Sequence, residues 1–283
     1  AQKERWLPEL VAGRRLWAFG LTEPSSGSDT RALRTRARLD DGHWVVNGQK
    51  QFITNSGTPI SAGVTITAIT GPGRDSEHPE ISAILIPQET AGYVVQPAYR
   101  KLGWHSSDTH PLAFDDCRVP EDHLLGERGG GQRQFLRTLT SGRAAIGALS
   151  LGLAQACLDA SLAYAKERIA FGEPIGKRQA IQFKLADMAT EIELARLIVY
   201  RAAAAVEDPA TPQEELTRLC SMAKLWASAV SRRAADEAVQ IHGGYGFIED
   251  YPVARYWRDV KINEIGEGTS EVQRMLIAGT LGL

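Results

Sequence analysis

The chain has 283 residues, of which 43% are hydrophobic and 23% are charged, and its formal net charge is −2 at pH 7. This composition excludes a disordered chain and suffices for one large domain or two smaller ones with full cores. The small net charge and the absence of a basic tract argue against nucleic acid and membranes as partners. No apolar run reaches the roughly 18 residues that a membrane span needs.

The three cysteines, Cys117, Cys157 and Cys220, are widely spaced and form no CxxC or Cys/His pattern. This favours reduced, buried thiols in an intracellular protein, and no metal site is expected. The N-terminal stretch AQKERWLPELVAGRRL has no signal-peptide pattern and is typical of a helix end followed by a loop. A cytoplasmic location in a bacterium is therefore expected.

Residues from about 17 to 120 carry strand signals. The stretch HWVVNGQKQFITN, residues 43–55, contains two extended runs around Asn47-Gly48, which predicts a hairpin turn at that dipeptide. Runs rich in β-branched residues follow at short intervals, separated by Gly, Pro and Asp: GVTITAIT, EISAILIP, GYVVQPAYR and PLAFDDCRVP. Short strands with few helical stretches between them predict a β-barrel or sandwich.

After about Gly129 the hydrophobic period becomes helical. Four helices are predicted, over about 130–168, 177–207, 212–241 and 250–280, with Gly/Pro-rich breaks between them. The second has one apolar face, formed by Ile181, Leu185, Met188, Ile192, Ala195 and Val199. The predicted fold is multi-domain α+β: a remnant of a helical domain at 1–16, a β domain at 17–126 and a four-helix bundle at 127–283.

The stretch AFGLTEPSSGSDT, residues 18–30, is the first candidate site. A strand is expected to end at Thr22, and the loop after it offers backbone N–H groups and the hydroxyls of Thr22, Ser26 and Ser28 to an anionic or heteroaromatic ligand. A plain turn that caps a strand is the alternative.

The stretch QFITNS, residues 51–56, is the second candidate site. Alternation places Phe52 and Thr54 on one strand face, which suits either a flat ring system or an ordinary core.

Two further candidates lie in the helical part. In ERIAFGEPIGKRQAIQ, residues 167–182, Arg168 ends one helix and Gln179 begins the next, so the pair could bracket a phosphate; Arg168 could equally compensate the helix dipole. In QIHGGYGFIEDYPVARYWRD the glycines after the helix end near Ile241 allow close backbone approach. Here His242 is expected to be solvated or capping, since no partner ligand lies at helical spacing.

The stretch NEIGEGTSEVQR, residues 263–274, breaks an otherwise helical tail and places Glu267 between Gly266 and Gly268. Taken together and in order, these stretches resemble the acyl-CoA dehydrogenase family of flavoproteins. The resemblance extends over the whole chain and includes FDDCRVPEDHLLGE and IQFKLADM. The family's N-terminal helical domain is missing from this stretch of sequence, and a mitochondrial matrix location therefore stays open as well.

The resemblance implies FAD as the cofactor, bound across a subunit interface, and an acyl-CoA as the substrate. It implies cofactor contacts at Phe19, Leu21, Thr22, Gly27, Ser28, Phe52, Ile53, Thr54, Arg168, Phe171, Gln179, Gln240, Ile241, His242, Gly243, Gly244, Thr269, Ser270 and Glu271. It implies substrate contacts at Ser28, Thr140, Ser141, Gly142, Arg143 and Gly268. Phe52 departs from the tryptophan that is usual at its position, although it keeps an aromatic face.

The resemblance also makes Glu267 the base that removes the α-proton of the thioester. Desolvation raises the pKa of a carboxylate, and the freed backbone N–H of Glu267 can help to hold the thioester oxygen. A subgroup that includes isovaleryl-CoA dehydrogenase takes its base from the position of Gly142, so that arrangement is excluded. Gly266 replaces a tyrosine that many relatives carry, which leaves the acyl chain length open.

The expected function is therefore FAD-dependent dehydrogenation of an acyl-CoA to the trans-2-enoyl-CoA, with hydride passed to flavin N5 and electrons to an electron-transfer flavoprotein. A homotetramer or homodimer with a role in β-oxidation and fatty acid metabolism is expected. The alternatives are a flavin monooxygenase or nitroalkane-oxidase-like enzyme on the same scaffold, and a non-catalytic subunit that contributes FAD contacts only.

Overall fold

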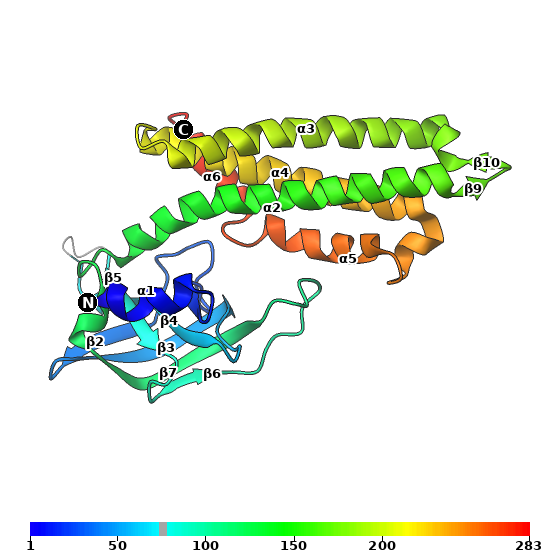
Figure 1. Cartoon of the computed structure of the whole chain (residues 1–283). Coiled ribbons are helices and arrows are strands. Elements are labelled where there is room, and N and C mark those ends of the chain that lie inside the picture. Colours follow the sequence, from blue (N-terminus) through cyan, green and yellow to red (C-terminus); the bar gives the residue numbers. More distant parts are fainter. Residues whose placement is uncertain (74–77) are drawn as a thin grey trace. The chain divides into compact units, whose positions relative to one another are not determined.

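The computed structural model describes residues 1–73 and 78–283. Its internal contacts divide the chain into two compact units, one of residues 1–101 and 105–137 and one of residues 102–104 and 138–283. The first unit holds a helix and a sheet, and the second is helical (Figure 1).

The first unit is built on one sheet with the strand order β6-β7-β3-β2-β4-β5-β8, and β1 pairs with β4 in parallel. A short helix, α1 (Gln2–Val11), precedes the sheet. The strands are β1 (Leu16–Gly20), β2 (Arg36–Asp40), β3 (His43–Thr54), β4 (Ser61–Gly71), β5 (Glu80–Pro87), β6 (Tyr93–Val95), β7 (Thr109–Pro120) and β8 (Leu124–Leu125). The prediction of a strand-rich segment followed by a helical one is confirmed, although β1 ends two residues before Thr22.

Apolar side chains of the long strands form the core of this unit. Trp44, Val46, Val64, Ile66 and Ile84 belong to one buried cluster. Helix α1 packs on the rest of this unit through aromatic side chains, since the ring centroids of Trp6 and Trp17 are 4.9 Å apart.

The predicted hairpin turn at Asn47-Gly48 is wrong, because β3 runs through both residues without a turn. Gly48 has φ +149°, and a Cβ there would lie 2.5 Å from Thr35 Oγ1, so the glycine permits a close approach between neighbouring segments. The pairing of β3 with β7 shifts register beside it. The turn that joins β2 to β3 is at Asp41-Gly42, where both residues have positive φ.

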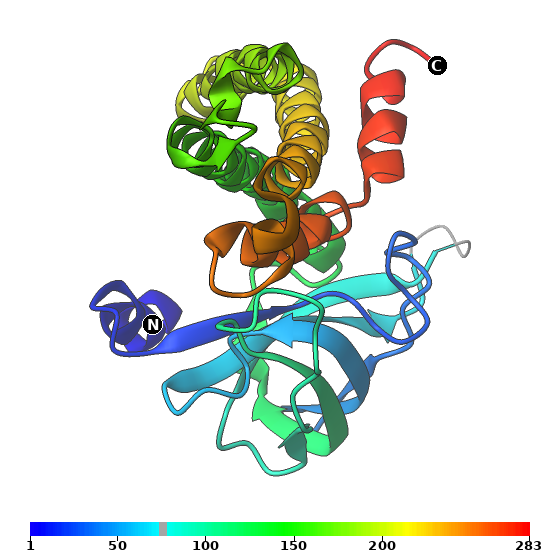
Figure 2. The same cartoon turned by 90° about the vertical axis from the view of Figure 1, so that its right-hand side faces the viewer.

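Three long helices dominate the second unit: α2 (Gly131–Glu167), whose first turns count with the first unit, α3 (Gln179–Glu207) and α4 (Gln213–His242). They run side by side, as the end-on view of Figure 2 shows. A small hairpin, β9 (Ile169–Ala170) and β10 (Glu173–Pro174), and a 3₁₀ turn, η2 (Ile175–Lys177), join α2 to α3. The 3₁₀ segment η3 (Gly243–Phe247) follows α4.

The predicted fourth helix is two helices, α5 (Pro252–Asp259) and α6 (Ser270–Gly279), separated by the 3₁₀ segment η4 (Val260–Glu264) and a turn at 265–269. Two glycines in the turn disfavour helix, and Thr269 starts α6 as its N-cap, with Oγ1 accepting from Val272 N at 3.3 Å.

Helix α3 buries the face that its sequence pattern predicted, with Met188, Ile192, Ala195 and Val199 in the core of the bundle. All three cysteines are free and buried, as expected. Small residues of α4 let its neighbours approach closely, and they include Ala223, Ala227, Ala234 and Ala238.

Helix α2 is long and apolar enough to cross a membrane by length and composition alone, although no uninterrupted apolar run of that length occurs in the sequence. Core helices of soluble proteins pass the same test. Alpha helix α2 contributes Leu151, Ala154, Cys157 and Leu158 to the core of the helical unit, which accounts for its apolar composition.

Candidate active site

Glu267 lies in the turn between η4 and α6 with φ +52°, and Gly268 follows with φ +94°. A non-glycine residue in this left-handed region costs about 1–3 kcal/mol and persists only where its surroundings impose it. The N–H of Glu267 donates none of the hydrogen bonds found among the described residues. The turn therefore presents a carboxylate and a free backbone donor from one residue.

Burial of the carboxyl end raises the pKa of Glu267, although the positive charges of Lys224 and Arg143 act in the opposite direction. The residue as a whole is exposed, but its carboxylate is packed against α2: a Cβ on Gly142 would lie 2.4 Å from Glu267 Oε2. Desolvation is thus local to the carboxyl group and favours its neutral form. A base with a raised pKa is better matched to removing a weakly acidic proton near neutral pH.

Arg143 is buried in α2 one residue after Gly142, and burial lowers the pKa of its guanidinium. Its Nη1 donates to Thr140 Oγ1 at 3.4 Å, whereas its Nε has no hydrogen-bond partner among the described residues. Ser141 is exposed, and its hydroxyl donates to the carbonyl of Thr138. Thr140, Ser141, Gly142 and Arg143 all belong to the helical unit, and of these Gly142 and Arg143 interact with Glu267.

Two buried side chains that the sequence analysis missed hold this turn. Lys224 Nζ donates to the carbonyl of Gly268 at 2.6 Å, and Gln273 Nε2 donates to the same oxygen at 2.9 Å. Both side chains are fully buried. A signal for Lys224 does exist, because it falls in the buried stripe of α4 with Cys220 and Ala227.

The loop after β1 has an internal bridge, in which the backbones of Glu23 and Ser26 exchange hydrogen bonds of 2.9 and 3.1 Å. Ser26 is buried and donates through its hydroxyl to the carbonyl of Asp29 at 2.6 Å, so the expectation that this hydroxyl faces a ligand is wrong.

The other predicted contact residues of this loop differ in exposure. Gly27 and Ser28 at the tip are exposed, and Leu21 and Thr22 are half-buried. Phe19 stacks on Phe135, with ring centroids 4.2 Å apart.

A buried ion pair, also missed, anchors this loop. Lys50 Nζ lies 2.8 Å from Glu23 Oε1 with both side chains almost inaccessible to solvent, and it also donates to the Leu21 carbonyl at 3.1 Å. The Glu23 carboxylate in turn accepts from the backbone N–H groups of Arg34 and Thr35. Burial opposes ionisation of Glu23, but Lys50 and these donors together hold its pKa below the ordinary value.

At the end of β3, Phe52 and Thr54 are exposed and Ile53 is buried, so the predicted alternation of faces is confirmed. Phe52 has φ +60° and is 59% exposed, beside Tyr99 at a ring-centroid distance of 5.2 Å. An exposed aromatic ring on a strained backbone is a costly arrangement for a side chain without a ligand.

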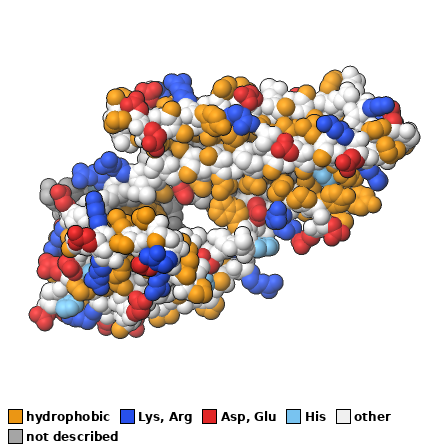
Figure 3. All heavy atoms as spheres, viewed as in Figure 1, with side chains coloured by type: hydrophobic (Ala, Val, Ile, Leu, Met, Phe, Trp, Pro, Cys, Tyr) orange, Lys and Arg blue, Asp and Glu red, His pale blue; other side chains and the backbone are white. Residues whose placement is uncertain are grey.

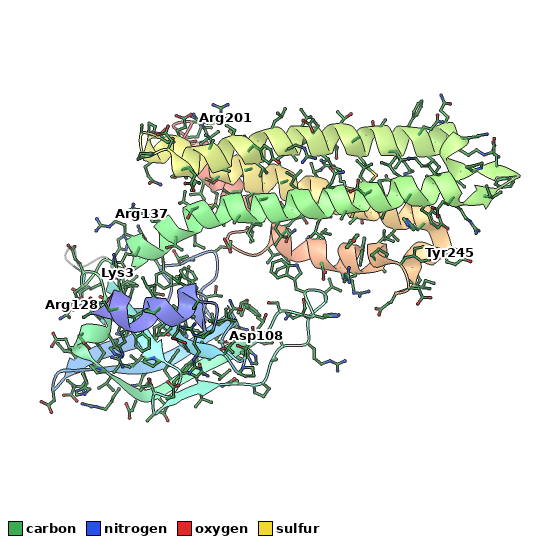
Figure 4. All side chains as sticks on the ribbon, viewed as in Figure 1. Lys3, Asp108, Arg128, Arg137, Arg201 and Tyr245 are labelled. Atoms are coloured by element: carbon green, nitrogen blue, oxygen red, sulfur yellow. The ribbon has the colours of Figure 1, made fainter. Side chains whose placement is uncertain are left out.

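The end of the helical unit carries a hollow of about 480 Å³. Its lining includes Tyr164, Arg168, the backbone of Gly243 and Gly244, and Tyr245, which Figure 4 labels. Arg168 is exposed after the last residue of α2, and its guanidinium lies 5.4 Å from the Tyr245 ring centre. A positively charged side chain and the backbone of two glycines lie beside an apolar hollow. This combination suits an anionic ligand that also carries a ring.

His242 lies in this hollow but is buried, so the solvated alternative is wrong. The other alternative, a capping side chain, is consistent with the ring nitrogen of His242 contacting a backbone carbonyl in the last turn of α4. Its ring stacks on Tyr164 at 4.2 Å, its Nδ1 lies 2.8 Å from the Ala238 carbonyl, and burial lowers its pKa. Gln240 and Gln179 are exposed, and so is Phe171, at 95% with φ +54°. Ile241 is buried beneath the hollow.

In the turn before α6, Thr269 serves as the cap, Ser270 is half-buried and Glu271 is exposed. Hydrogen bonds to its own backbone N–H and to Thr269 lower the pKa of Glu271. Glu267 therefore differs from the nearby acid Glu271 in the direction of its pKa shift.

Residues 18–117 match the family described as acyl-CoA dehydrogenase, middle domain, and residues 129–282 match acyl-CoA dehydrogenase, C-terminal domain. A probable acyl-CoA dehydrogenase of Bacillus subtilis, YngJ, is 48% identical over 99% of this chain and 72% of its own. Butyryl-CoA dehydrogenase from Megasphaera elsdenii superposes with a TM-score of 0.93 at 42% identity, over 100% of this chain and 72% of that one. An acyl-CoA dehydrogenase from Bacillus anthracis, solved with FAD, gives 0.91 at 36% identity, over 99% of this chain and 50% of that one.

Proposed function

Because this chain belongs to the acyl-CoA dehydrogenase family, we propose that it catalyses the FAD-dependent α,β-dehydrogenation of an acyl-CoA thioester. The observation that carries the proposal is the turn at Glu267, where one residue offers a carboxylate whose pKa is raised by burial and an N–H that donates to no group among the described residues. The two groups suit two tasks at one thioester: removal of the α-proton and stabilisation of charge on the carbonyl oxygen.

Each of these two tasks is assigned to a group of Glu267 itself. Glu267 accepts the α-proton, and its N–H donates to the thioester oxygen as negative charge develops there. Lys224 and Arg143 favour the ionised carboxylate, which must exist before it can accept a proton. Burial of the carboxyl group has the opposite effect and keeps the base strong. The balance of these effects sets the pH at which the base works.

The residues present fit FAD. Exposed aromatic side chains at strained positions, Phe52 and Phe171, offer flat faces, and Arg168 with the Gly243–Gly244 backbone offers an anion site. We assign the cofactor contacts to these groups, to the loop from Phe19 to Ser28, and to Thr269 and Ser270. When bound, FAD supplies the ring whose N5 takes the β-hydride as the trans-2-enoyl-CoA forms.

The exposure of Phe171 and Gln179 on the helical unit supports binding across a subunit interface, in a homodimer or homotetramer. We further propose an electron-transfer flavoprotein as the acceptor of the electrons, on the ground of the family resemblance. Retention of Glu267 argues against a monooxygenase or a non-catalytic subunit.

The experiment is anaerobic titration of the purified yellow protein with saturated acyl-CoA thioesters of graded chain length. The proposed function predicts loss of flavin absorbance with at least one chain length and formation of the corresponding enoyl-CoA. A protein that takes up no flavin, or whose flavin stays oxidised with every thioester, would contradict it.

A further inference from the structure

Lys224 is a fully buried lysine whose part in the proposed reaction has so far been only the effect of its charge on Glu267. Placing an ammonium group inside a protein is costly unless a partner compensates it. Burial lowers the pKa of Lys224 to about 8, while the carboxylates of Glu267, Glu264 and Glu271 support its charged form. We therefore expect the group that accepts the hydrogen bond of Lys224 to have a functional role.

The hydrogen bond of its ammonium goes to the carbonyl of Gly268, at 2.6 Å. Gln273, fully buried in α6, donates to the same oxygen at 2.9 Å. A carbonyl oxygen has two lone pairs, and donors from α4 and α6 thus occupy both. The carbonyl next to Glu267 is fixed from two elements.

This fixed carbonyl lies in the strained part of the turn. Glu267 and Gly268 are consecutive residues with positive φ, +52° and +94°. A Cβ on Gly268 would lie 2.7 Å from Gln273 Nε2, so the donor packs directly against the turn. Rotation of the turn into an ordinary conformation would move the Gly268 oxygen away from both donors. The two hydrogen bonds therefore supply the constraint that a left-handed Glu267 requires.

Lys224 also acts by its charge. The charged groups that act on Glu267 are Lys224 from α4 and Arg143 from α2. Lys224 in turn interacts with two further carboxylates, Glu264 from η4 and Glu271 from α6. Glu264 is already paired with Lys261 and Arg232, and the Cys220 thiol has a raised pKa and stays neutral. The two cations are thus the groups that favour ionised Glu267, and Gln273 carries no charge.

Building on the proposed role of Glu267 as the base, we propose that Lys224 is a positioning residue, which fixes the Glu267 turn through the Gly268 carbonyl and keeps the carboxylate ionised by its charge. Gln273 shares the first role but not the second. The two roles can therefore be separated by substitution at these two positions.

The test compares flavin reduction by acyl-CoA, measured by stopped flow from pH 5 to 9, in flavin-loaded wild type and variants. Lys224→Met should lower the limiting rate by roughly 10²-fold, the scale of a misplaced catalytic group, and move the acidic limb to higher pH. Gln273→Met should lower the limiting rate and leave the limb in place. Lys184→Met, which removes an ion pair with Glu237 elsewhere in the bundle, is the control and should change neither.

Lys224→Arg keeps the charge and should leave the acidic limb in place while lowering the rate, and it serves if Lys224→Met does not fold. An unshifted acidic limb in Lys224→Met, or a wild-type rate in both Gln273→Met and Lys224→Arg, would overturn the proposal. Glu267→Gln distinguishes this failure from that of the proposed function. If Glu267→Gln is inactive while the Lys224 variants behave as wild type, only the positioning role is lost.

A crystal structure of Lys224→Met gives a readout independent of activity. The positioning role predicts that the Gly268 carbonyl turns away from its position in the wild type, with a changed φ at Glu267. An unchanged turn would contradict it.

Discussion

Glu267 and Gly142 are packed so closely that a Cβ on Gly142 would stand 2.4 Å from Glu267 Oε2. The absence of a side chain on α2 is thus what gives the carboxylate its place. The contact links two elements that are far apart in sequence and gives Gly142 a function that needs no polar group.

Gly142→Ala should therefore displace the carboxylate and slow flavin reduction by roughly 10²-fold, the scale of a misplaced catalytic group. The protein should not lose stability, because alanine is about 1 kcal/mol better than glycine in a helix and the carboxylate can move. Gly152→Ala is the matched control, since it lies in the same helix with open space around it. Stopped-flow rates and melting temperatures of both variants check this. Equal rates in both would contradict the contact's importance.

Lys50→Met should destabilise the protein by about 3–5 kcal/mol, because it leaves the Glu23 carboxylate buried without its partner. Denaturant unfolding of the flavin-free protein measures this loss. The loop from Leu21 to Ser28 should also loosen, so that FAD dissociates more readily. Lys50→Met with Glu23→Gln should recover part of the stability, since no unpaired charge then remains. A double variant less stable than Lys50→Met would contradict this account.

The pKa of Lys224, lowered to about 8 from the model-peptide value of 10.5, makes stability depend on pH. Between about pH 8 and 10.5 the unfolded chain keeps a proton on Lys224 that the folded chain has released. Stability therefore rises with pH through this window by the contribution of Lys224. Unfolding of wild type and Lys224→Met at pH 7 to 10 should show the difference between them shifting in favour of the wild type as pH rises. A constant difference would contradict the lowered pKa.

Binding of FAD across an interface predicts that the flavin-loaded protein is a dimer or tetramer. Apolar side chains are exposed on the helical unit (Figure 3), and on α3 they include Phe183, Leu197 and Tyr200. Surface of this kind commonly marks an interface. Size-exclusion chromatography with light scattering checks the prediction, and a monomer that retains its flavin would refute it.

The sequence predicted those parts of the fold that depend on local signals. The interruption around Gly266 and Gly268 follows from the low helix propensity of glycine, although residues 250–280 were predicted as a single helix, and the apolar face of α3 follows from periodicity. The Asn47-Gly48 turn was wrong because contacts distant in sequence decide that stretch: Asn47 bonds to Asp116, 69 residues away. A local propensity was overridden by tertiary pairing.

The residues that hold the candidate site in place were not predicted, for the same reason. Lys224 and Gly268 are 44 residues apart, and a bond from a side chain to a backbone carbonyl has no sequence signature. Lys50 and Glu23 are 27 residues apart. Each lysine does occupy a position that the hydrophobic pattern of its helix or strand predicts to be buried. A buried lysine needs a polar or charged partner, but the pattern does not identify that partner.

The most direct test of the account is flavin reduction in Glu267→Gln. The amide has nearly the same shape as the carboxylate, so FAD binding and folding should survive, and acyl-CoA should still perturb the flavin spectrum. Removal of a general base costs about 10²–10⁴-fold, so bleaching should be slowed at least that far. Bleaching at the wild-type rate would show that the α-proton goes to another group, and would contradict the assignment of Glu267 as the base.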